Sequence, residues 1–292
     1  MRTSRSIKNI IAKFLGAFWI LDGLLQFQPK MFSSDFVSGV LVPNLNGQPF
    51  FLHGIIAFGI FLWNLNPPLL NTLAALIQVA IGILLFFPPS DKKFRIGLYI
   101  SIFWGLVVWL FGEGAGDLLT GSSSIYTGAP GSVFMYVVIS VFLLVSERIK
   151  LTLLPKITAW VLILGAILQL QPSLWTSGGV QESLMAGTME SVHVLATFPT
   201  YISNLLSVNP IVGNWILVLF AFVIGIALLF RPNRITGTIA FIFIFLIWWL
   251  GQDFGMLTTL IAGTTTDPNT APLLALLILP LFFDYSQQTG GI

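Results

Sequence analysis

The chain of 292 residues has no cysteine, two histidines and few charged residues. Without cysteine it cannot form a disulfide, a thiolate zinc site, a cysteine-ligated iron–sulfur cluster or a covalently attached haem. The two histidines, His53 and His193, allow at most one bis-histidine haem. Only 8% of the residues are charged, whereas a soluble domain carries about 25%. A soluble enzyme is therefore excluded, and any chemistry depends on carboxylates, amides, hydroxyls, aromatic rings and two imidazoles.

Apolar residues are abundant instead: 56% of the chain is apolar, 14% is aromatic and the mean hydropathy is +0.92. A bilayer core about 30 Å thick is crossed by roughly 20 apolar residues. We predict an all-α polytopic membrane protein with eight spans, at about 10–28, 69–88, 96–116, 131–146, 157–172, 211–230, 236–255 and 271–285. The first window lacks a small-x-small cleavage site, so we expect a retained span. Segments 50–63 and 182–195 are predicted to be helices at the exoplasmic interface.

The charged residues are sorted along the predicted topology. Twelve of the thirteen cations precede the first span or lie in the loops that join spans two and three, four and five, or six and seven; Lys30 is the exception. Eight of the eleven acids lie at the opposite ends of the spans. Because basic residues resist translocation, we expect both termini in the cytoplasm. We expect a multi-pass protein of the cytoplasmic (inner) membrane of a prokaryote, in contact with lipid and without nucleic-acid binding.

The sequence contains an internal duplication. Residues 21–29 recur as residues 164–172 at an offset of 143, and residues 81–87 recur as residues 224–230 at the same offset. After a deletion in a loop, residues 109–116 match residues 248–255, and Ala129-Pro130 matches Ala271-Pro272. We predict two four-helix membrane repeats, 1–150 and 151–292. Each has an even number of spans, so the repeats are expected to be parallel and related by an axis along the membrane normal.

Four-span units with a Gln-Pro exit after the first helix and an acidic, glycine-rich exit after the third resemble the DoxX/DoxD-like membrane family, as two fused copies. The resemblance implies an integral membrane subunit of a quinone-linked redox system, since the DoxD branch is the membrane subunit of a thiosulfate:quinone oxidoreductase. It also implies quinone as a cofactor and a membrane or exoplasmic redox partner protein. The absence of cysteine excludes a thiol mechanism. A small-molecule or ion transporter and a non-catalytic scaffold subunit remain as alternatives.

Ionisable residues inside a span cost about 2.5 kcal/mol or more, so they point to function. Asp22 lies inside the first span, and Gln26 follows one turn later on the same face. Glu113 and Asp117 have the same spacing at the end of the third span. We predict that these four residues surround an exoplasmic cavity where a carboxylate exchanges a proton with a quinone or a transported substrate. A counterpart cavity in the second repeat is predicted to contain Gln169, Gln252 and Asp253.

The candidate proton-exchanging residues are Asp22, Glu113 and Asp253. The candidate quinone- or substrate-binding residues are Gln26, Gln28, Trp109, Asp117, Gln169, Gln171, Trp248 and Gln252. In the second repeat, Gly165, Gln252 and Met256 stand where the first has Asp22, Glu113 and Asp117. The alternative interpretation is that the shallower acids lie in headgroup water and end helices, which we favour for Asp117. Phe103, Trp104 and Phe111 either flank a quinone ring or belong to an interfacial aromatic belt.

Glu190 and His193 are three residues apart, on one face of a predicted helix with Met185 and Met189 nearby. Histidine and methionine together would suit copper. The methionines also follow core spacing, which leaves Glu190 and His193 on a wet face. Because a full ligand set is not visible, we predict no metal site and keep Glu190 and His193 as a weak option.

Overall fold

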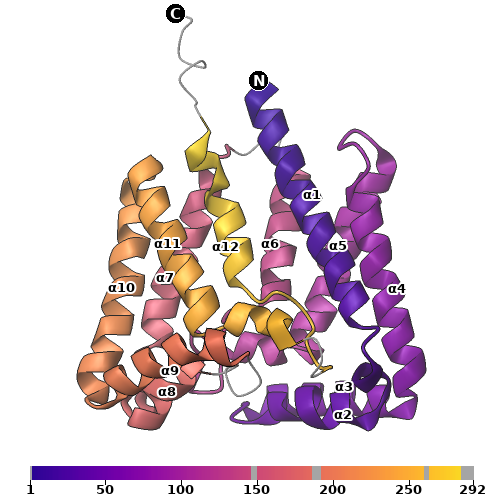
Figure 1. The fold of residues 1–292 in the computed structure, drawn as a ribbon. Helices are drawn as coiled ribbons and strands as arrows, with labels where there is room; N and C mark the ends of the chain where they lie inside the picture. The colour runs from indigo at the N-terminus through magenta and orange to yellow at the C-terminus, as the bar shows by residue number, and fades with distance from the viewer. Residues whose placement is uncertain (1, 146–149, 186–191, 260–262, 284–292) are drawn as a thin grey trace, which may run out of the picture.

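The computed structural model describes residues 2–145, 150–185, 192–259 and 263–283. Within these ranges the chain forms helices joined by loops, without a strand. Eight helices stand side by side as an upright bundle (Figure 1). They are α1 (Arg2–Leu25), α4 (Pro67–Leu85), α5 (Lys92–Phe111), α6 (Ser132–Val145), α7 (Leu153–Leu168), α10 (Pro210–Phe230), α11 (Arg234–Leu250) and α12 (Ala271–Ile278), which η8 (Leu279–Phe282) extends.

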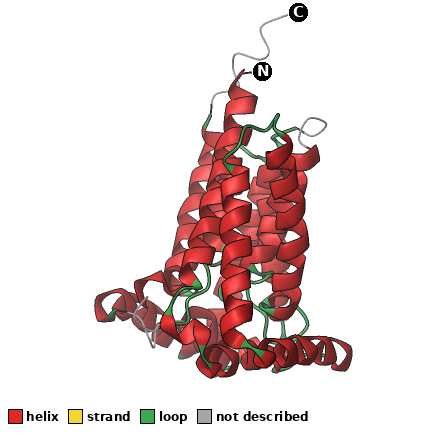
Figure 2. Ribbon diagram, turned by 90° about the vertical axis from the view of Figure 1, so that its right-hand side faces the viewer, coloured by secondary structure: helices red, strands yellow, loops and turns green. Residues whose placement is uncertain are grey.

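Other helices lie across one end of the bundle and form a layer, which we call the lateral layer (Figures 1 and 2). It contains α2 (Ser34–Phe36), α3 (Phe50–Leu65), α8 (Ser177–Met185) and α9 (His193–Ser207). The start of α1, the α4–α5 turn, the α10–α11 turn and η8 all lie at the opposite end (Figure 1).

Among the described residues, three helices are long and apolar enough to cross a membrane: α4, α5 and α10. Each predicted span overlaps a helix of the bundle, although most helices begin earlier than predicted: α1, for example, starts at Arg2 and ends at Leu25. The predicted lateral helix over 50–63 is confirmed as α3. The prediction of one helix over 182–195 is wrong, because α8 ends at Met185 and Val192 has an extended backbone (φ −60°, ψ 125°) before α9 begins.

Small residues allow the closest helix pairs to form. A Cβ atom added to Gly16 in α1 would lie 3.0 Å from the Gly82 carbonyl oxygen in α4. In the same way, a Cβ atom on Gly225 in α10 would lie 3.0 Å from the Ala159 carbonyl oxygen in α7. Such close backbone approach is how small residues stabilise helix pairs in an apolar medium.

Two left-handed turns follow α5 and α11. Residues 114–117 have φ between 54° and 64°, and residues 253–256 have φ between 43° and 68°. For residues other than glycine this conformation costs about 1–2 kcal/mol each. These strained turns direct the chain away from the bundle just after Glu113 in the first case and Gln252 in the second.

Candidate functional site

A cavity of about 330 Å³ lies between α1, α3, α4, α5 and the loop before α12. Six polar side chains and a larger number of apolar ones line it. The polar ones are Asp22, Gln26, Gln78, Glu113, Thr266 and Asp267. We call this space the acidic cavity. It brings together three of the four residues that the sequence analysis placed around one site: Asp22, Gln26 and Glu113.

Asp22 is the deepest acid of the acidic cavity. Its side chain is 2% exposed, and neither carboxylate oxygen has a hydrogen-bond partner. The hydroxyl of Tyr136 is close to this carboxylate but also forms no hydrogen bond of normal geometry. An unsatisfied buried polar group costs about 1–3 kcal/mol. Asp22 is therefore costly to the fold as it stands, which is typical of a group that serves a ligand.

Two glutamines and an asparagine continue this polar surface. Gln26 directly follows the last residue of α1, and Asn71 of α4 holds this turn by donating from Nδ2 to the Gln26 carbonyl oxygen at 2.7 Å. The side-chain oxygens of Gln26, Gln78 and Asn71 are all buried without a hydrogen-bond partner. Gln26 and Gln78, which line the cavity, thus offer acceptors to a molecule that enters it.

Glu113 lies two residues beyond the end of α5, and its side chain bonds to the first residues of α6. Its Oε1 accepts hydrogen bonds from the Ser132 hydroxyl (2.6 Å) and the Val133 amide (3.1 Å). Desolvation raises the pKa of the Glu113 carboxyl above its usual value, and the charge of Asp267 raises this pKa further. Gly131 is required beside it, because a Cβ atom there would clash with Glu113 Oε2. Glu113 is thus fixed in place and can carry a proton near neutral pH.

Aromatic and aliphatic side chains form the walls. Trp63 of α3 and Trp104 and Phe111 of α5 line the cavity, and both indole N–H groups are buried without a hydrogen-bond acceptor. Leu62, at the rim, is 39% exposed. The outer faces of α4 and α5 next to this rim carry further exposed apolar residues, including Leu73 and Leu106.

A second, more polar space adjoins the acidic cavity on the side of the lateral layer. It measures about 210 Å³, and we call it the vestibule. Gly112, Glu113 and Asp267 line both spaces. Asp117 lines the vestibule but not the acidic cavity; its side chain is exposed and lies 3.5 Å from Gln48 Nε2. Asp117 therefore lies outside the acidic cavity, and desolvation raises the pKa of its carboxyl to about 6.

The matching residues of the second half are used for internal hydrogen bonds. Gln169 is fully buried: its Oε1 accepts from Ser124 Oγ (2.7 Å), and its Nε2 donates to Asn214 Oδ1 (2.8 Å) and Ser183 Oγ (3.1 Å). Its carbonyl oxygen accepts from Asn214 Nδ2 at 2.9 Å. Unlike Gln26, Gln169 has no polar side-chain atom left for a ligand.

Gln252 and Asp253 are buried in the second half as well. Gln252 Nε2 donates to the Ile125 carbonyl oxygen (3.2 Å), and its Oε1 accepts from the Ala271 amide (3.0 Å). Asp253 is the first residue of the left-handed turn after α11. Neither residue lines the acidic cavity or the vestibule, so the structure does not bring Asp253 together with Asp22 and Glu113.

The remaining predicted binding residues connect loops to helices. Gln28 Nε2 donates to the Thr265 carbonyl oxygen (2.7 Å), and Gln171 Oε1 accepts from the Ser123 amide (3.1 Å). The indoles of Trp109 and Trp248 donate at 2.8 Å to the carbonyl oxygens of Pro130 and Pro268. None of Gln28, Gln171, Trp109 and Trp248 lines the acidic cavity.

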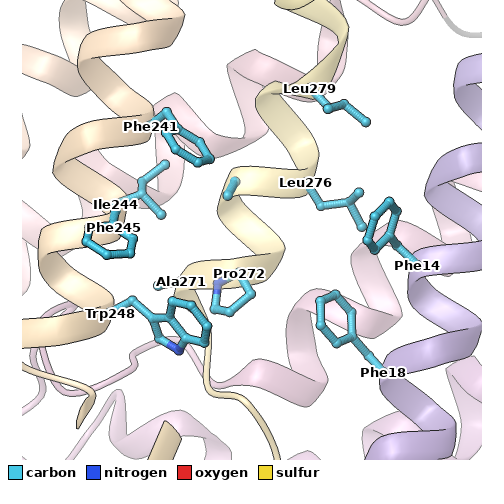
Figure 3. A pocket seen from close by; sticks show the side chains of 11 residues that line it. Phe14, Phe18, Phe241, Ile244, Phe245, Trp248, Ala271, Pro272, Leu276 and Leu279 are labelled. Atoms are coloured by element: carbon cyan, nitrogen blue, oxygen red, sulfur yellow. The ribbon is translucent and has the colours of Figure 1, made fainter. Parts of the chain in front are cut away.

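Trp248 lines an apolar groove of about 300 Å³ instead, between α1, α11 and α12 (Figure 3). Phe14 and Phe18 approach it from α1, and Phe241 and Phe245 from α11 (Figure 3). All its lining side chains are apolar or, in Trp248, have their one polar group bonded elsewhere. The groove thus has no group that exchanges protons.

The weak metal option gains no ligands. His193 begins α9, and Glu190 lies outside the described residues. His53 borders a shallow apolar pocket with Phe50 and Phe51 on α3. In the part of the chain that the structure describes, no group of three histidine or acidic residues is arranged to hold a metal ion.

Sequence reasoning did not include Gln78, Asp267 and Trp63 in the site. Gln78 is the clearest signal that was missed, since a glutamine in the middle of an apolar window is costly for the same reason as Asp22. Asp267 was recognised only as one of the exoplasmic acids. Its place in the first half's cavity follows from tertiary contacts across the two halves, and no local pattern indicates it. Of the aromatic residues considered for a ring site, Trp104 and Phe111 line the cavity, whereas Phe103 points outward with 69% exposure.

Comparison with family models, curated proteins and solved structures finds no match for this chain.

Proposed function

We propose that the chain is an integral membrane protein of eight spans in two parallel repeats, 1–150 and 151–292. Equivalent hydrogen bonds support this: Asn71 bonds to the Gln26 carbonyl oxygen, and Asn214 bonds to the Gln169 carbonyl oxygen. Both partners are shifted by the 143 residues of the sequence offset. The left-handed turns and the tryptophan–proline bonds also occur in both halves, at offsets of 138 to 139 that follow the loop deletion.

The lateral layer belongs on the exoplasmic side in this proposal. The start of α1 and the α4–α5 and α10–α11 turns lie together at the other end of the bundle (Figure 1). These segments carry most of the basic residues, among them Arg5, Lys92, Arg95 and Arg231. The positive-inside rule then places that end, with both termini, in the cytoplasm of a prokaryotic cell.

For the function itself, we infer that the acidic cavity binds a quinone and exchanges protons with it, as in a membrane subunit of a quinone-dependent oxidoreductase. The observation that carries this is the combination of an apolar, aromatic-walled cavity with buried polar atoms that have no partners. Quinone oxygens accept hydrogen bonds, and the N–H groups of Trp63 and Trp104 and a protonated Asp22 are available to donate. Quinol hydroxyls donate, and the oxygens of Gln26 and Gln78 are available to accept. The exposed apolar rim near Leu62 leaves a path for an isoprenoid tail toward lipid.

This function fits the DoxX/DoxD-like resemblance, which implies the same class of chemistry. The absence of cysteine excludes a thiol mechanism, and the resemblance implies that the electrons come from a membrane or exoplasmic partner protein. The cavity is fixed by the fold, so it supplies binding and proton exchange while the partner supplies the electrons.

Quinone binding is tested by titrating the purified full-length protein in lipid nanodiscs with decylubiquinone and following the quenching of tryptophan fluorescence. We expect saturable binding in the wild type. Asp22→Leu should weaken it about two- to tenfold, since one net hydrogen bond contributes about 0.5–1.5 kcal/mol. Asp35→Asn is the matched control, because Asp35 is an exposed acid of the lateral layer that does not line the cavity. Absence of saturable binding in the wild type would refute the proposal.

A carrier for organic cations is the second candidate. It is favoured by one observation: Asp22, Glu113 and Asp267 line the acidic cavity without any described basic side chain among its lining residues. A cation would be held by these carboxylates and by the face of Trp104. The same titration is carried out with an alkylammonium probe in place of the quinone, so that binding of the cation is compared with binding of the quinone. A neutral quinone competes with the cation only if both bind at the same site.

A further inference from the structure

Asp267 belongs to the second half of the chain but lies in the cavity of the first half. It is held by two hydrogen bonds: Thr266 Oγ1 donates to its Oδ2 at 2.8 Å, and the Asn269 amide donates to its Oδ1 at 2.7 Å. The residues that follow anchor this loop to the first half, since Asn269 Nδ2 and Thr270 Oγ1 donate to the carbonyl oxygens of Thr127 and Gly128. The carboxylate is therefore held in one place.

The position of Asp267 joins the two spaces of the site. It lines both the acidic cavity and the vestibule, and Glu113 does the same. Its charge acts on both Asp22 and Glu113, so the three carboxyl groups form one electrostatic cluster. No described basic side chain is among the lining residues of this cavity.

In the matching loop of the first half, the position that corresponds to Asp267 has an apolar residue. The two loops correspond at an offset of 142, because Gln28 bonds to Thr265 and its match Gln171 bonds to Ser123. Ile125 therefore corresponds to Asp267. Ile125 is fully buried and contacts α7 at Gly165, where an added Cβ atom would lie 2.5 Å from Ile125 Cβ. Gly165 corresponds to Asp22.

The three carboxylates and Gln78 of the acidic cavity are all replaced by uncharged residues in the other half. Asp22, Gln78, Glu113 and Asp267 correspond to Gly165, Ala221, Gln252 and Ile125. In the second half, the same helix–loop contact is formed by Gly165 and Ile125 and contains no carboxylate. Two carboxylates at the same contact in the first half have no structural necessity.

We propose that Asp267 is a proton-relay residue that connects the substrate at Asp22 with the water of the vestibule. The inference rests on the proposed function and adds the route by which protons reach the quinone. One quinone takes two electrons from the reduced partner protein and two protons to form quinol. Each proton passes from vestibule water to Asp267 or Glu113, then to Asp22, and then to a quinone oxygen, and each carboxylate is left as it began.

The relay is tested with the full-length protein in nanodiscs loaded with decylubiquinone. The bound quinone is reduced by an electron pulse from a photoexcited flavin with a sacrificial amine donor, and a pH indicator follows proton uptake. Asp267→Asn keeps the size of the side chain and the hydrogen bond that Oδ1 accepts from the Asn269 amide, but cannot carry a proton. We expect quinone affinity within about threefold of the wild type and proton uptake slowed at least tenfold. Asp267→Glu should restore the rate, and Asp35→Asn should leave it unchanged.

A variant that copies the other half guards against a purely structural effect. In the double variant Asp22→Gly with Asp267→Ile, the chain repeats the Gly165–Ile125 contact that the fold already tolerates. We expect it to unfold at a temperature equal to or above that of the wild type while proton uptake is lost. Fast proton uptake in Asp267→Asn with quinone bound would overturn the relay and leave the proposed function intact. Loss of quinone affinity in that variant would also overturn it, by making Asp267 a binding residue, whereas absence of quinone binding in the wild type would refute the function.

Discussion

The contact between Gly165 and Ile125 gives a direct energetic test of how the second half is filled. Ile125 is fully buried, and its side chain occupies the space next to Gly165. Ile125→Ala should destabilise the protein by about 2–5 kcal/mol, the usual range for a buried isoleucine. Gly165→Ala adds a methyl group 2.5 Å from Ile125 Cβ. Overpacking of this kind costs about 1–3 kcal/mol, against which the helix propensity of alanine gains about 1 kcal/mol over glycine.

The double variant Ile125→Ala with Gly165→Ala shows whether the two residues interact or whether their effects on stability are independent. The methyl group of alanine at position 165 fits the space that Ile125→Ala opens, so the clash disappears and part of the cavity is filled. We expect the double variant to be no less stable than Ile125→Ala, with a favourable coupling of about 1–3 kcal/mol. Thermal unfolding in detergent, followed by circular dichroism, measures all four corners of the cycle. Gly54→Ala is the matched control, because no atom lies within 4 Å of a Cβ at that helical glycine. Additive costs would show that Ile125 does not fill the site that matches Asp22.

Two further predictions concern the polar residues around the site. Asn214→Leu removes two buried hydrogen bonds to Gln169 and should lower the free energy of unfolding by about 1–3 kcal/mol. Asn71→Leu removes one such bond to Gln26 and should lower it by less than half as much. Chemical unfolding of both variants measures the two costs, and equal costs would contradict this. The raised pKa of Glu113 means that the folded protein binds more protons than the unfolded chain, so stability should fall as pH rises from about 4.5 toward the folded-state pKa. Glu113→Gln should reduce this slope in thermal unfolding without abolishing it, because Asp22 and Asp267 face the same cavity, and an unchanged slope would show that Glu113 does not titrate there.

The sequence allowed the helical class, the positions of the helices and half of the site to be predicted. Asp22 and Gln26 were found because one helix places them a turn apart, and a carboxylate inside an apolar window stands out by its cost. Glu113 was found from its position at the end of the third predicted span. Local patterns of this kind survive folding, since helix periodicity alone decides which side chains share a face.

The rest of the site depends on contacts that no local pattern encodes. Asp267 reaches the cavity because the loop before α12 crosses to the other half and is anchored there at Gly128. Conversely, Gln169 looked equivalent to Gln26 in sequence, yet Asn214, Ser124 and Ser183 satisfy its amide completely. Which glutamine is available to a ligand is decided by its neighbours in space, and those neighbours come from segments 14 to 45 residues away.

The contrast between the halves is itself the strongest argument for a single site. Both halves keep the residues that hold the framework, since the asparagine bond to the first helix and the tryptophan bond to a proline carbonyl occur in each. They differ at the positions that line the acidic cavity, where the unsatisfied oxygens of Asp22, Gln26 and Gln78 gather. If the carboxylates were structural, the second half would need equivalents to fold, and it closes the same contact with Gly165 and Ile125 instead. The excess polarity of the first half is therefore separable from folding, which is the property expected of a binding and proton-exchange site.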